Sequence, residues 1–211
     1  MRQRKVKNEE EKIEAFGNYV IKDAEMHKGH WRELFGNDNP IYIEVGCGKG
    51  QFITTLARVN PNGNYIAVEG AGSVVLRALE KASMEGLKNI KFITKYINEI
   101  TDFFEEGEVD GIYLNFSDPW PKDRHAKRRL THTRYIKGYK KVLKQGGSIE
   151  FKTDNDGLFA FSVEEFFKND MQLVECTNDL HKTDFKSKQF TTEYEDKFNK
   201  IGKNIHYLRA K

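Results

Sequence analysis

The stretch IYIEVGCGKGQFITTLARV, residues 41–59, decides the fold class. Its first five residues form a short apolar run that predicts a strand, and residues 51–59 carry apolar side chains at helical spacing. Between them lie Gly46, Gly48 and Gly50. Glycines at such a turn let the backbone approach a ligand, because there is no Cβ to collide and positive φ is allowed. The stretch therefore predicts a ligand-binding loop between a strand and a helix.

The glycine spacing excludes two common loops. The dinucleotide fingerprint G-x-G-x-x-G would need glycine where Gln51 stands, and the phosphate loop G-x-x-x-x-G-K-[ST] does not occur here. The spacing G-x-G-x-G, two residues after Glu44, instead resembles the first motif of class I methyltransferases. In that motif the loop passes under the methionine part of S-adenosylmethionine.

Strand-like and helix-like segments alternate along the rest of the chain. Further strands are expected at 64–69, 90–93, 111–115, 148–152, 171–176 and 205–208, the last at the sheet edge, and helices at 73–85, 98–104, 133–143 and 158–168. This alternation predicts an α/β fold with a doubly wound, mostly parallel seven-stranded sheet over residues 39–211. Residues 1–38 are expected to form a helical N-terminal extension whose Trp31, Leu34 and Phe35 dock on that domain.

Composition limits the class of protein. The 35 basic and 32 acidic residues leave a net charge of +3, so the balance alone does not indicate nucleic acid. Cys47 and Cys176 form no C-x-x-C pair, and no zinc-ligand spacing appears, so no metal is expected. No signal peptide and no apolar stretch of roughly 18–20 residues is visible, which predicts a cytoplasmic protein that does not enter the membrane.

Ligands of such a sheet bind beyond the carboxyl ends of its strands, which draws attention to the residues there. Glu69 ends the second predicted strand, where a carboxylate can accept hydrogen bonds from both hydroxyls of a ribose. An NAD-dependent enzyme would place an acid similarly, so Glu69 alone does not discriminate. The loop at residues 94–98 after the third strand is expected to line an adenine, or to be an ordinary exposed loop.

The most informative stretch is NFSDPWPKDRHAKRRL, residues 115–130, which begins where the fourth strand ends. Proline disfavours the helical region for its predecessor, so Asp118 is held extended, and the two prolines around Trp120 stiffen the loop. Trp120 either stacks on a base or anchors the core. Four fixed positive charges follow within six residues, between Arg124 and Arg129, and favour a phosphate-binding surface.

This stretch closely resembles the signature of tRNA (guanine-N7)-methyltransferases, F-[SP]-D-P-W-P-K-x-R-H-x-K-R-R-L, which is matched from Phe116 through Leu130. The resemblance extends to 44–50, Glu69, 152–155 and 192–195. It implies S-adenosylmethionine as methyl donor, tRNA as substrate and N7 of the variable-loop guanine as acceptor.

The resemblance also implies roles for individual residues. Cofactor-binding positions are Glu44, Gly46, Gly48, Gly50, Glu69, Tyr96 and Asp118, and Asp118 is also the catalytic position. Substrate-binding positions are Lys122, Asp154, Thr192, Glu193, Tyr194 and Glu195. RNA-contacting positions are Arg124, His125, Ala126, Lys127, Arg128 and Arg129. Tyr96 departs from the pattern, because the family usually has Asp or Asn there, so the side-chain contact to adenine is either missing or replaced by the backbone there or by Asn98.

The chemistry of N7 is compatible with these residues. N7 carries a lone pair and no proton, so no base is needed to deprotonate it, and catalysis can rest on positioning and electrostatics. A carboxylate can accept from guanine N1–H and the exocyclic amine; Asp118 and Asp154 both suit this role, and the sequence does not choose between them.

Three other functions are weighed against this one. Residues 117–120 partly resemble the [NDS]-P-P-[YFW] motif of amino-group methyltransferases, although Asp118 stands where a proline is expected. A catalytically dead RNA-binding module and an NAD-dependent oxidoreductase are the others. The sequence leaves open whether the chain is a monomer or a homodimer.

Overall fold

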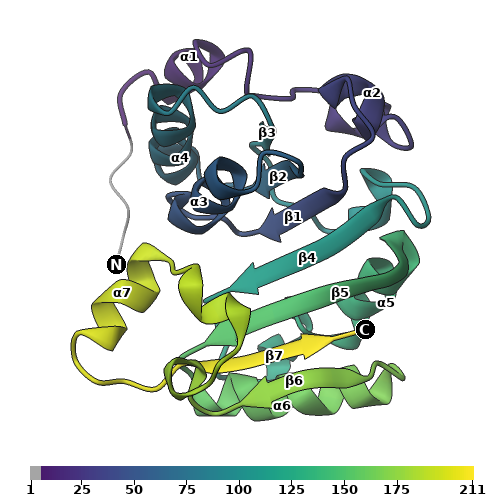
Figure 1. The fold of residues 1–211 in the computed structure, drawn as a ribbon, viewed down its shortest axis with the longest axis vertical. Helices are drawn as coiled ribbons and strands as arrows, with labels where there is room; N and C mark the ends of the chain where they lie inside the picture. Colours follow the sequence, from purple (N-terminus) through teal and green to yellow (C-terminus); the bar gives the residue numbers. More distant parts are fainter. Residues whose placement is uncertain (1–5) are drawn as a thin grey trace.

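A seven-stranded sheet forms the centre of the molecule, in the computed structural model that describes residues 6–211 (Figure 1). The strand order is β3-β2-β1-β4-β5-β7-β6. Strands β1 to β5 are parallel, and β7 runs antiparallel to β5 and β6. Their bounds are β1 Ile41–Val45, β2 Asn64–Val68, β3 Ile90–Ile93, β4 Val109–Asn115, β5 Leu143–Thr153, β6 Leu173–Thr177 and β7 His206–Ala210. The predicted α/β class and mostly parallel sheet are confirmed.

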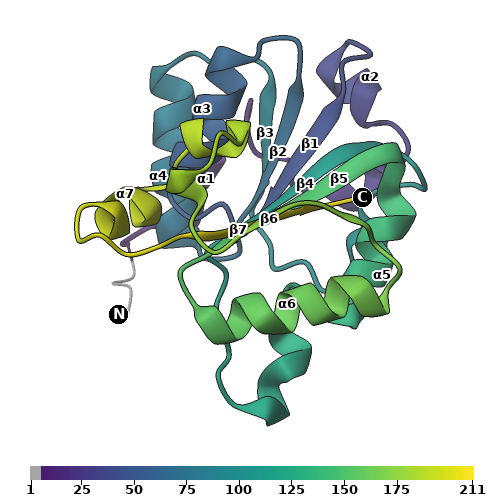
Figure 2. The same ribbon diagram turned by 60° about the horizontal axis from the view of Figure 1, so that its bottom comes forward.

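Helices cover both faces of this sheet (Figure 2). The α-helices are α1 Glu9–Glu14, α2 Trp31–Phe35, α3 Gln51–Val59, α4 Gly72–Met84, α5 Thr133–Val142, α6 Asp156–Lys168 and α7 Glu193–Asn199. Short 3₁₀ helices are η1 Ala24–His27, η2 Ile100–Asp102, η3 Asp123–Arg128, η4 Leu180–Lys182 and η5 Lys186–Gln189. The helix predicted over 98–104 is therefore wrong in type and length, since only the short turn η2 forms there.

Two hydrophobic cores result from the alternation of side chains along the strands. Ile41, Ile43 and Val45 of β1 point to the face covered by α5 and α6, while Tyr42 packs with α3 and α4 on the other face. A third, smaller cluster of Leu180, Ile205 and Tyr207 packs against Phe185 and Phe198. These two phenylalanines lie in the stretch between β6 and β7, residues 178–205, which we call the C-terminal segment.

The position of the last strand differs from the prediction. We expected it at the sheet edge, but β7 lies between β5 and β6, and β6 is the edge. The burial of the two strands explains the difference: four of the five residues of β7 are buried, whereas Val174 and Cys176 of β6 are exposed. Antiparallel pairing to β5 lets β7 enter after β6 without a crossover helix.

The N-terminal segment packs on the sheet as well. Trp31 is fully buried, and its Nε1–H donates to the Phe103 carbonyl at 2.8 Å. Val20 forms a parallel bridge with Phe92 and so continues the sheet beyond β3. Of the predicted extension, residues 1–5 lie outside the described part. None of the helices between residues 6 and 211 combines the length and apolar character that crossing a membrane requires.

Candidate active site

The candidate site residues lie beyond the carboxyl ends of the parallel strands (Figure 1). These strand ends lie side by side along one edge of the sheet, which we call the carboxyl-terminal edge. The glycine loop follows β1, Glu69 follows β2, Tyr96 follows β3, Asp118 follows β4 and Asp154 follows β5. Segments far apart in sequence therefore meet at this edge, as expected for a doubly wound sheet.

The glycine loop depends on backbone conformations that favour glycine. Gly46, Gly48 and Gly50 have φ of 79°, 57° and 81°. A Cβ on Gly50 would also lie 2.5 Å from that of Ala78, so this glycine lets α3 approach α4 closely. Glu69 stabilises the loop, because its carboxylate accepts a hydrogen bond from the Gly48 N–H at 3.1 Å. The same carboxylate accepts from the N–H of Ala71 at 2.9 Å.

Glu44 presents a buried acceptor to the same loop. Its side chain is 1% exposed, Oε1 accepts from Asn115 Nδ2 at 2.8 Å, and Oε2 has no hydrogen-bond partner. Burial raises the pKa of Glu44 to about 8, although the Asn115 hydrogen bond opposes this. Leaving a buried acceptor unpaired costs about 1–3 kcal/mol, so the geometry favours a ligand that supplies a donor.

Tyr96 lies on the neighbouring loop, with its ring against Gly70. A Cβ on Gly70 would come within 2.4 Å of the ring, so the glycine makes room for the tyrosine. The side chain is 75% exposed. Tyr96 thus offers an aromatic surface beside Gly70, the residue that follows Glu69, and it belongs to the loop that we expected to line an adenine.

The loop after β4 is held by Arg129. Arg129 is buried, and its guanidinium donates to the carbonyls of Pro119 at 3.1 Å and Trp120 at 3.0 Å. The guanidinium also lies 4.4 Å over the Phe161 ring. Trp120 has a φ of 40°, a strained conformation for a residue with a side chain, and these hydrogen bonds stabilise it. Arg129 therefore faces inward, unlike the other positive charges of its run, and leaves Asp118 exposed on a braced loop.

The remaining positive charges of the run face outward from η3. Lys122, Arg124, Lys127 and Arg128 are exposed, whereas His125 and Ala126 are half-buried. The Arg128 guanidinium lies 4.7 Å over the Trp120 ring, and the His125 ring meets the same indole edge-on at 5.7 Å. Trp120 is thus half-buried against the basic surface and is not one of the core residues.

The C-terminal segment reaches over this edge and brings the remaining predicted residues to it. The Tyr194 ring lies 5.1 Å from the ring of Phe116, at the start of the loop that holds Asp118. Glu193 pairs with Lys81 of α4, and Asp154 pairs with Lys203. Thr192 caps α7 by accepting from the Glu195 N–H at 2.9 Å.

Glu195 differs from its neighbours because its side chain is buried in the interior. Its Oε2 lies 3.1 Å from Lys152 Nζ, and its Oε1 lies 3.0 Å from His181 Nε2. Lys152 and Glu195 are 1% and 0% exposed. Burial lowers the pKa of Lys152 and raises that of Glu195, while the attraction within the pair opposes both shifts. The Glu195 carboxylate is therefore engaged within the protein and turned away from the solvent.

Comparison with known proteins identifies the family. A family model described as a putative methyltransferase matches residues 38–208. A tRNA (guanine-N(7)-)-methyltransferase of Geobacillus sp. (strain WCH70) is 48% identical over 201 residues, which cover 95% of this chain and 91% of that protein. One of Lachnoclostridium phytofermentans is 49% identical over 210 residues, covering 100% and 98%. The chain belongs to the tRNA (guanine-N7)-methyltransferase family. The family predicted from residues 116–130 is confirmed.

Solved structures agree on the fold. A structure described as an antibiotic related methyltransferase superposes with a TM-score of 0.64 at 17% identity, covering 92% of this chain and 96% of that one. A SAM-dependent methyltransferase from Aquifex aeolicus gives 0.57 at 14% identity, covering 96% and 88%. At such identities the likeness establishes the methyltransferase fold alone.

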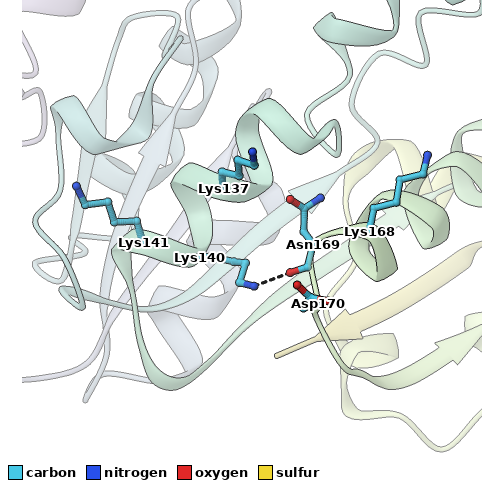
Figure 3. Close-up of a pocket in the computed structure, with 6 residues that line it drawn as sticks. All are labelled: Lys137, Lys140, Lys141, Lys168, Asn169 and Asp170. Atoms are coloured by element: carbon cyan, nitrogen blue, oxygen red, sulfur yellow. Dashed lines mark hydrogen bonds between the residues drawn. The ribbon is translucent and has the colours of Figure 1, made fainter.

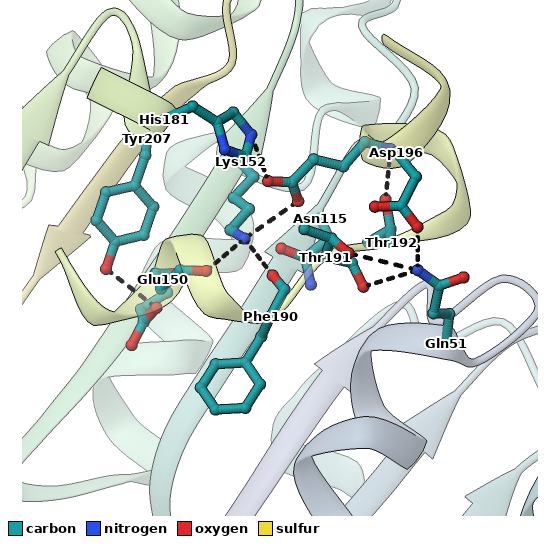
Figure 4. Close-up of polar contacts among 12 residues, drawn as sticks. Gln51, Asn115, Glu150, Lys152, His181, Phe190, Thr191, Thr192, Asp196 and Tyr207 are labelled. Carbon is teal, nitrogen blue, oxygen red and sulfur yellow. Dashed lines mark hydrogen bonds and ion pairs between the residues drawn. The ribbon is translucent and has the colours of Figure 1, made fainter. Parts of the chain in front are cut away.

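Three side chains that organise the site were not predicted from the sequence. Asn115 donates to Glu44, and Lys152 binds Glu195. Gln51 contacts the C-terminal segment through Asp196 (Figure 4). The role of Lys152 could have been predicted, because a lysine at the end of an apolar, buried strand needs a partner of opposite charge. The roles of Asn115 and Gln51 could not have been predicted, because their partners lie more than 70 residues away in the sequence.

A lysine-rich depression of about 460 Å³ lies elsewhere, where α5 and α6 end (Figure 3). Its lining residues are Lys137, Lys140, Lys141, Lys168, Asn169 and Asp170. Lys140 donates to the Asn169 carbonyl, and Lys168 pairs with Glu165. Positive side chains at helix C-termini compensate the partial negative charge of the last carbonyls, which accounts for this cluster. Within residues 6–211 no group of three or more acidic, His or Cys side chains is arranged to hold a metal ion.

Proposed function

We propose that this protein transfers a methyl group from S-adenosylmethionine to N7 of a guanine in tRNA, by family relationship the guanine of the variable loop. One observation carries the proposal: the glycine loop with Glu69, the braced loop with Asp118 and the basic helix η3 all stand at one sheet edge. The relatives that share nearly half of the sequence are named for this reaction.

The residues around the glycine loop fit the cofactor. Glu44 Oε2 is buried without a partner, and an ammonium group such as that of the methionine part favours the ionised form of this carboxyl and donates to it. Glu69 uses its carboxylate for two backbone N–H groups and keeps lone pairs for ribose hydroxyls. Tyr96 offers its exposed ring to the adenine, in place of the Asp or Asn expected from the family.

Catalysis then rests on position and charge. When bound, S-adenosylmethionine would supply an electrophilic methyl group: the N7 lone pair would form the new N–C bond as the methyl–sulfur bond breaks and S-adenosylhomocysteine leaves. The positive charge would pass from sulfur to the purine, and no proton would leave N7. Asp118 is exposed on a loop that Arg129 holds rigid. A carboxylate fixed there orients the guanine through its N–H groups and offsets the developing charge. Asp154 is the second candidate; its carboxylate is paired with Lys203, so Asp118 is the freer of the two.

The tRNA backbone is assigned to the outward-facing charges of η3. Arg124, Lys127 and Arg128 are exposed, and Lys122 precedes the helix. Arg129 is assigned to the loop and not to a phosphate. We propose that the chain acts as a monomer or a homodimer. We place the reaction in the cytoplasm, where tRNA is the substrate and unpaired thiols such as Cys47 stay reduced.

Methylation of synthetic tRNA tests the proposal. An unmodified transcript is incubated with labelled S-adenosylmethionine and the protein, and the digest should contain 7-methylguanosine. A matched transcript with 7-deazaguanosine at the variable-loop position has carbon in place of N7 and should accept no methyl group. Methylation of the deaza transcript would instead indicate an exocyclic amino group, and a third transcript with adenosine there tests the position.

A further inference from the structure

The first residue of α3 holds the C-terminal segment. Gln51 follows Gly50 directly, and its Nε2 donates to Asp196 Oδ2 at 2.6 Å (Figure 4). The same nitrogen lies 3.4 Å from both the carbonyl and the hydroxyl oxygen of Thr191. These partners bracket residues 192–195, the segment to which the family assigns substrate contacts. One side chain therefore joins the cofactor loop to both ends of that segment.

Two further anchors fix the same segment, but from elements outside the glycine loop. Lys152 of β5 donates to the carbonyls of Ser187 at 2.9 Å and Phe190 at 2.6 Å, and to the Glu195 carboxylate. Lys81 of α4 pairs with Glu193. Of the three anchors, Gln51 is adjacent in sequence to the glycine loop, so it is the one whose position depends directly on the conformation of that loop.

We propose that Gln51 is a positioning residue that couples the cofactor site to the tRNA site. A ligand on the glycine loop fixes the first turn of α3, and the Gln51 amide then fixes residues 191–196 in the place from which they contact the substrate. Once the first ligand has ordered residues 191–196, the second ligand binds without the entropic cost of ordering them. The two ligands therefore bind with positive cooperativity. The coupling is reciprocal. This inference rests on the proposed function.

The hydrogen bond between Gln51 and Asp196 allows a test by exchange of donor and acceptor. Gln51→Glu keeps the shape of the side chain but sets a second carboxylate against Asp196, so the contact is lost. Adding Asp196→Asn to that variant restores a hydrogen bond, with the amide now on α7. Gln145→Glu makes the same change of charge at an exposed position near the start of β5 and serves as the matched control.

The readout is the affinity for S-adenosylhomocysteine, measured by calorimetry without RNA and at saturating unmodified tRNA. We expect tRNA to tighten binding roughly 5-fold or more in the wild type, the lower end of usual coupling factors. The ratio should fall to about 1 in Gln51→Glu and return in the double variant, while Gln145→Glu keeps the wild-type ratio. Binding without tRNA should change little in any variant, and KM for tRNA should rise more than kcat falls in Gln51→Glu.

Different failures have different meanings. A wild-type protein that methylates tRNA but shows a ratio of 1 overturns the coupling and leaves the proposed function intact. So does a Gln51→Glu variant that keeps the full ratio, or a double variant that does not regain it. A wild type that yields no 7-methylguanosine overturns the proposed function itself.

Discussion

Replacing Lys152 with methionine should destabilise the protein strongly. The ammonium group is 1% exposed, and it supplies hydrogen bonds to the carbonyls of Ser187 and Phe190 and to the fully buried Glu195 carboxylate. Methionine is similar in length and leaves no large cavity, so the loss is electrostatic. Removing one partner of a buried pair typically costs about 3–5 kcal/mol, because the other charge remains buried without compensation. At roughly 2–4 °C per kcal/mol for a chain of this size, Tm should fall by about 6–20 °C.

The assay is urea unfolding at pH 7 together with a thermal scan. Lys144→Met is the matched control on the same strand: its side chain is exposed, and its stability should stay within about 0.5 kcal/mol of the wild type. Adding Glu195→Leu to Lys152→Met should recover part of the loss, because the uncompensated charge is then gone. If Lys152→Met unfolds within about 1 kcal/mol of the wild type, the buried pair is not what holds the C-terminal segment.

Three further changes test the site. Asp118→Asn should lower the single-turnover methylation rate roughly 10²–10³-fold with little change in tRNA affinity, since a charge felt mainly in the transition state is lost; a wild-type rate would transfer the role to Asp154. Arg124→Ala combined with Lys127→Ala should reduce the slope of log affinity against log salt by roughly 2, at about 0.9 for each phosphate contact, with unchanged cofactor affinity. Without cofactor, Glu44 is protonated in the folded state up to a pKa of about 8 but ionised above pH 4.5 when unfolded, so its contribution to stability falls as pH rises through that window. Urea unfolding of Glu44→Gln between pH 5 and 8 should lack this decline, which is at most about 1.4 kcal/mol per pH unit, and a variant with the wild-type slope would contradict it.

Local patterns explain which parts of the fold were predictable from sequence. The strand at residues 41–45 and the helix at 51–59 were predicted at their observed bounds, because the apolar run, the glycines and the helical spacing all lie within 19 residues. The neighbours of a strand are set by distant segments. The pattern at residues 205–208 predicted a strand but not its insertion between β5 and β6. That insertion depends on backbone pairing with two distant strands, in which Arg209 lies opposite Glu150 of β5 on one side and Glu175 of β6 on the other.

The same distinction applies to the candidate site. The carboxyl ends of parallel strands meet at one edge, so predicting the strands was enough to bring Glu69, Asp118 and Asp154 together. The surrounding sequence does not distinguish Arg129 from Arg128, although Arg129 faces inward and Arg128 faces outward. The difference is made by the Phe161 ring of α6 and by the two loop carbonyls, which only the folded chain places around Arg129.

Directional hydrogen bonds, more than apolar packing, place the C-terminal segment over the site. The hydrophobic cluster beneath it has three fully buried members, and apolar contacts of that extent tolerate small displacements. A buried ion pair is seldom more stabilising than an apolar pair of the same volume. Lys152, however, fixes two carbonyls and one carboxylate at defined distances, and Gln51 fixes Thr191 and Asp196 of the same segment. Methyl transfer without a proton-abstracting base depends on alignment, where a displacement of about 1 Å can lower the rate 10²-fold. The polar anchors therefore supply the positional accuracy that this chemistry requires.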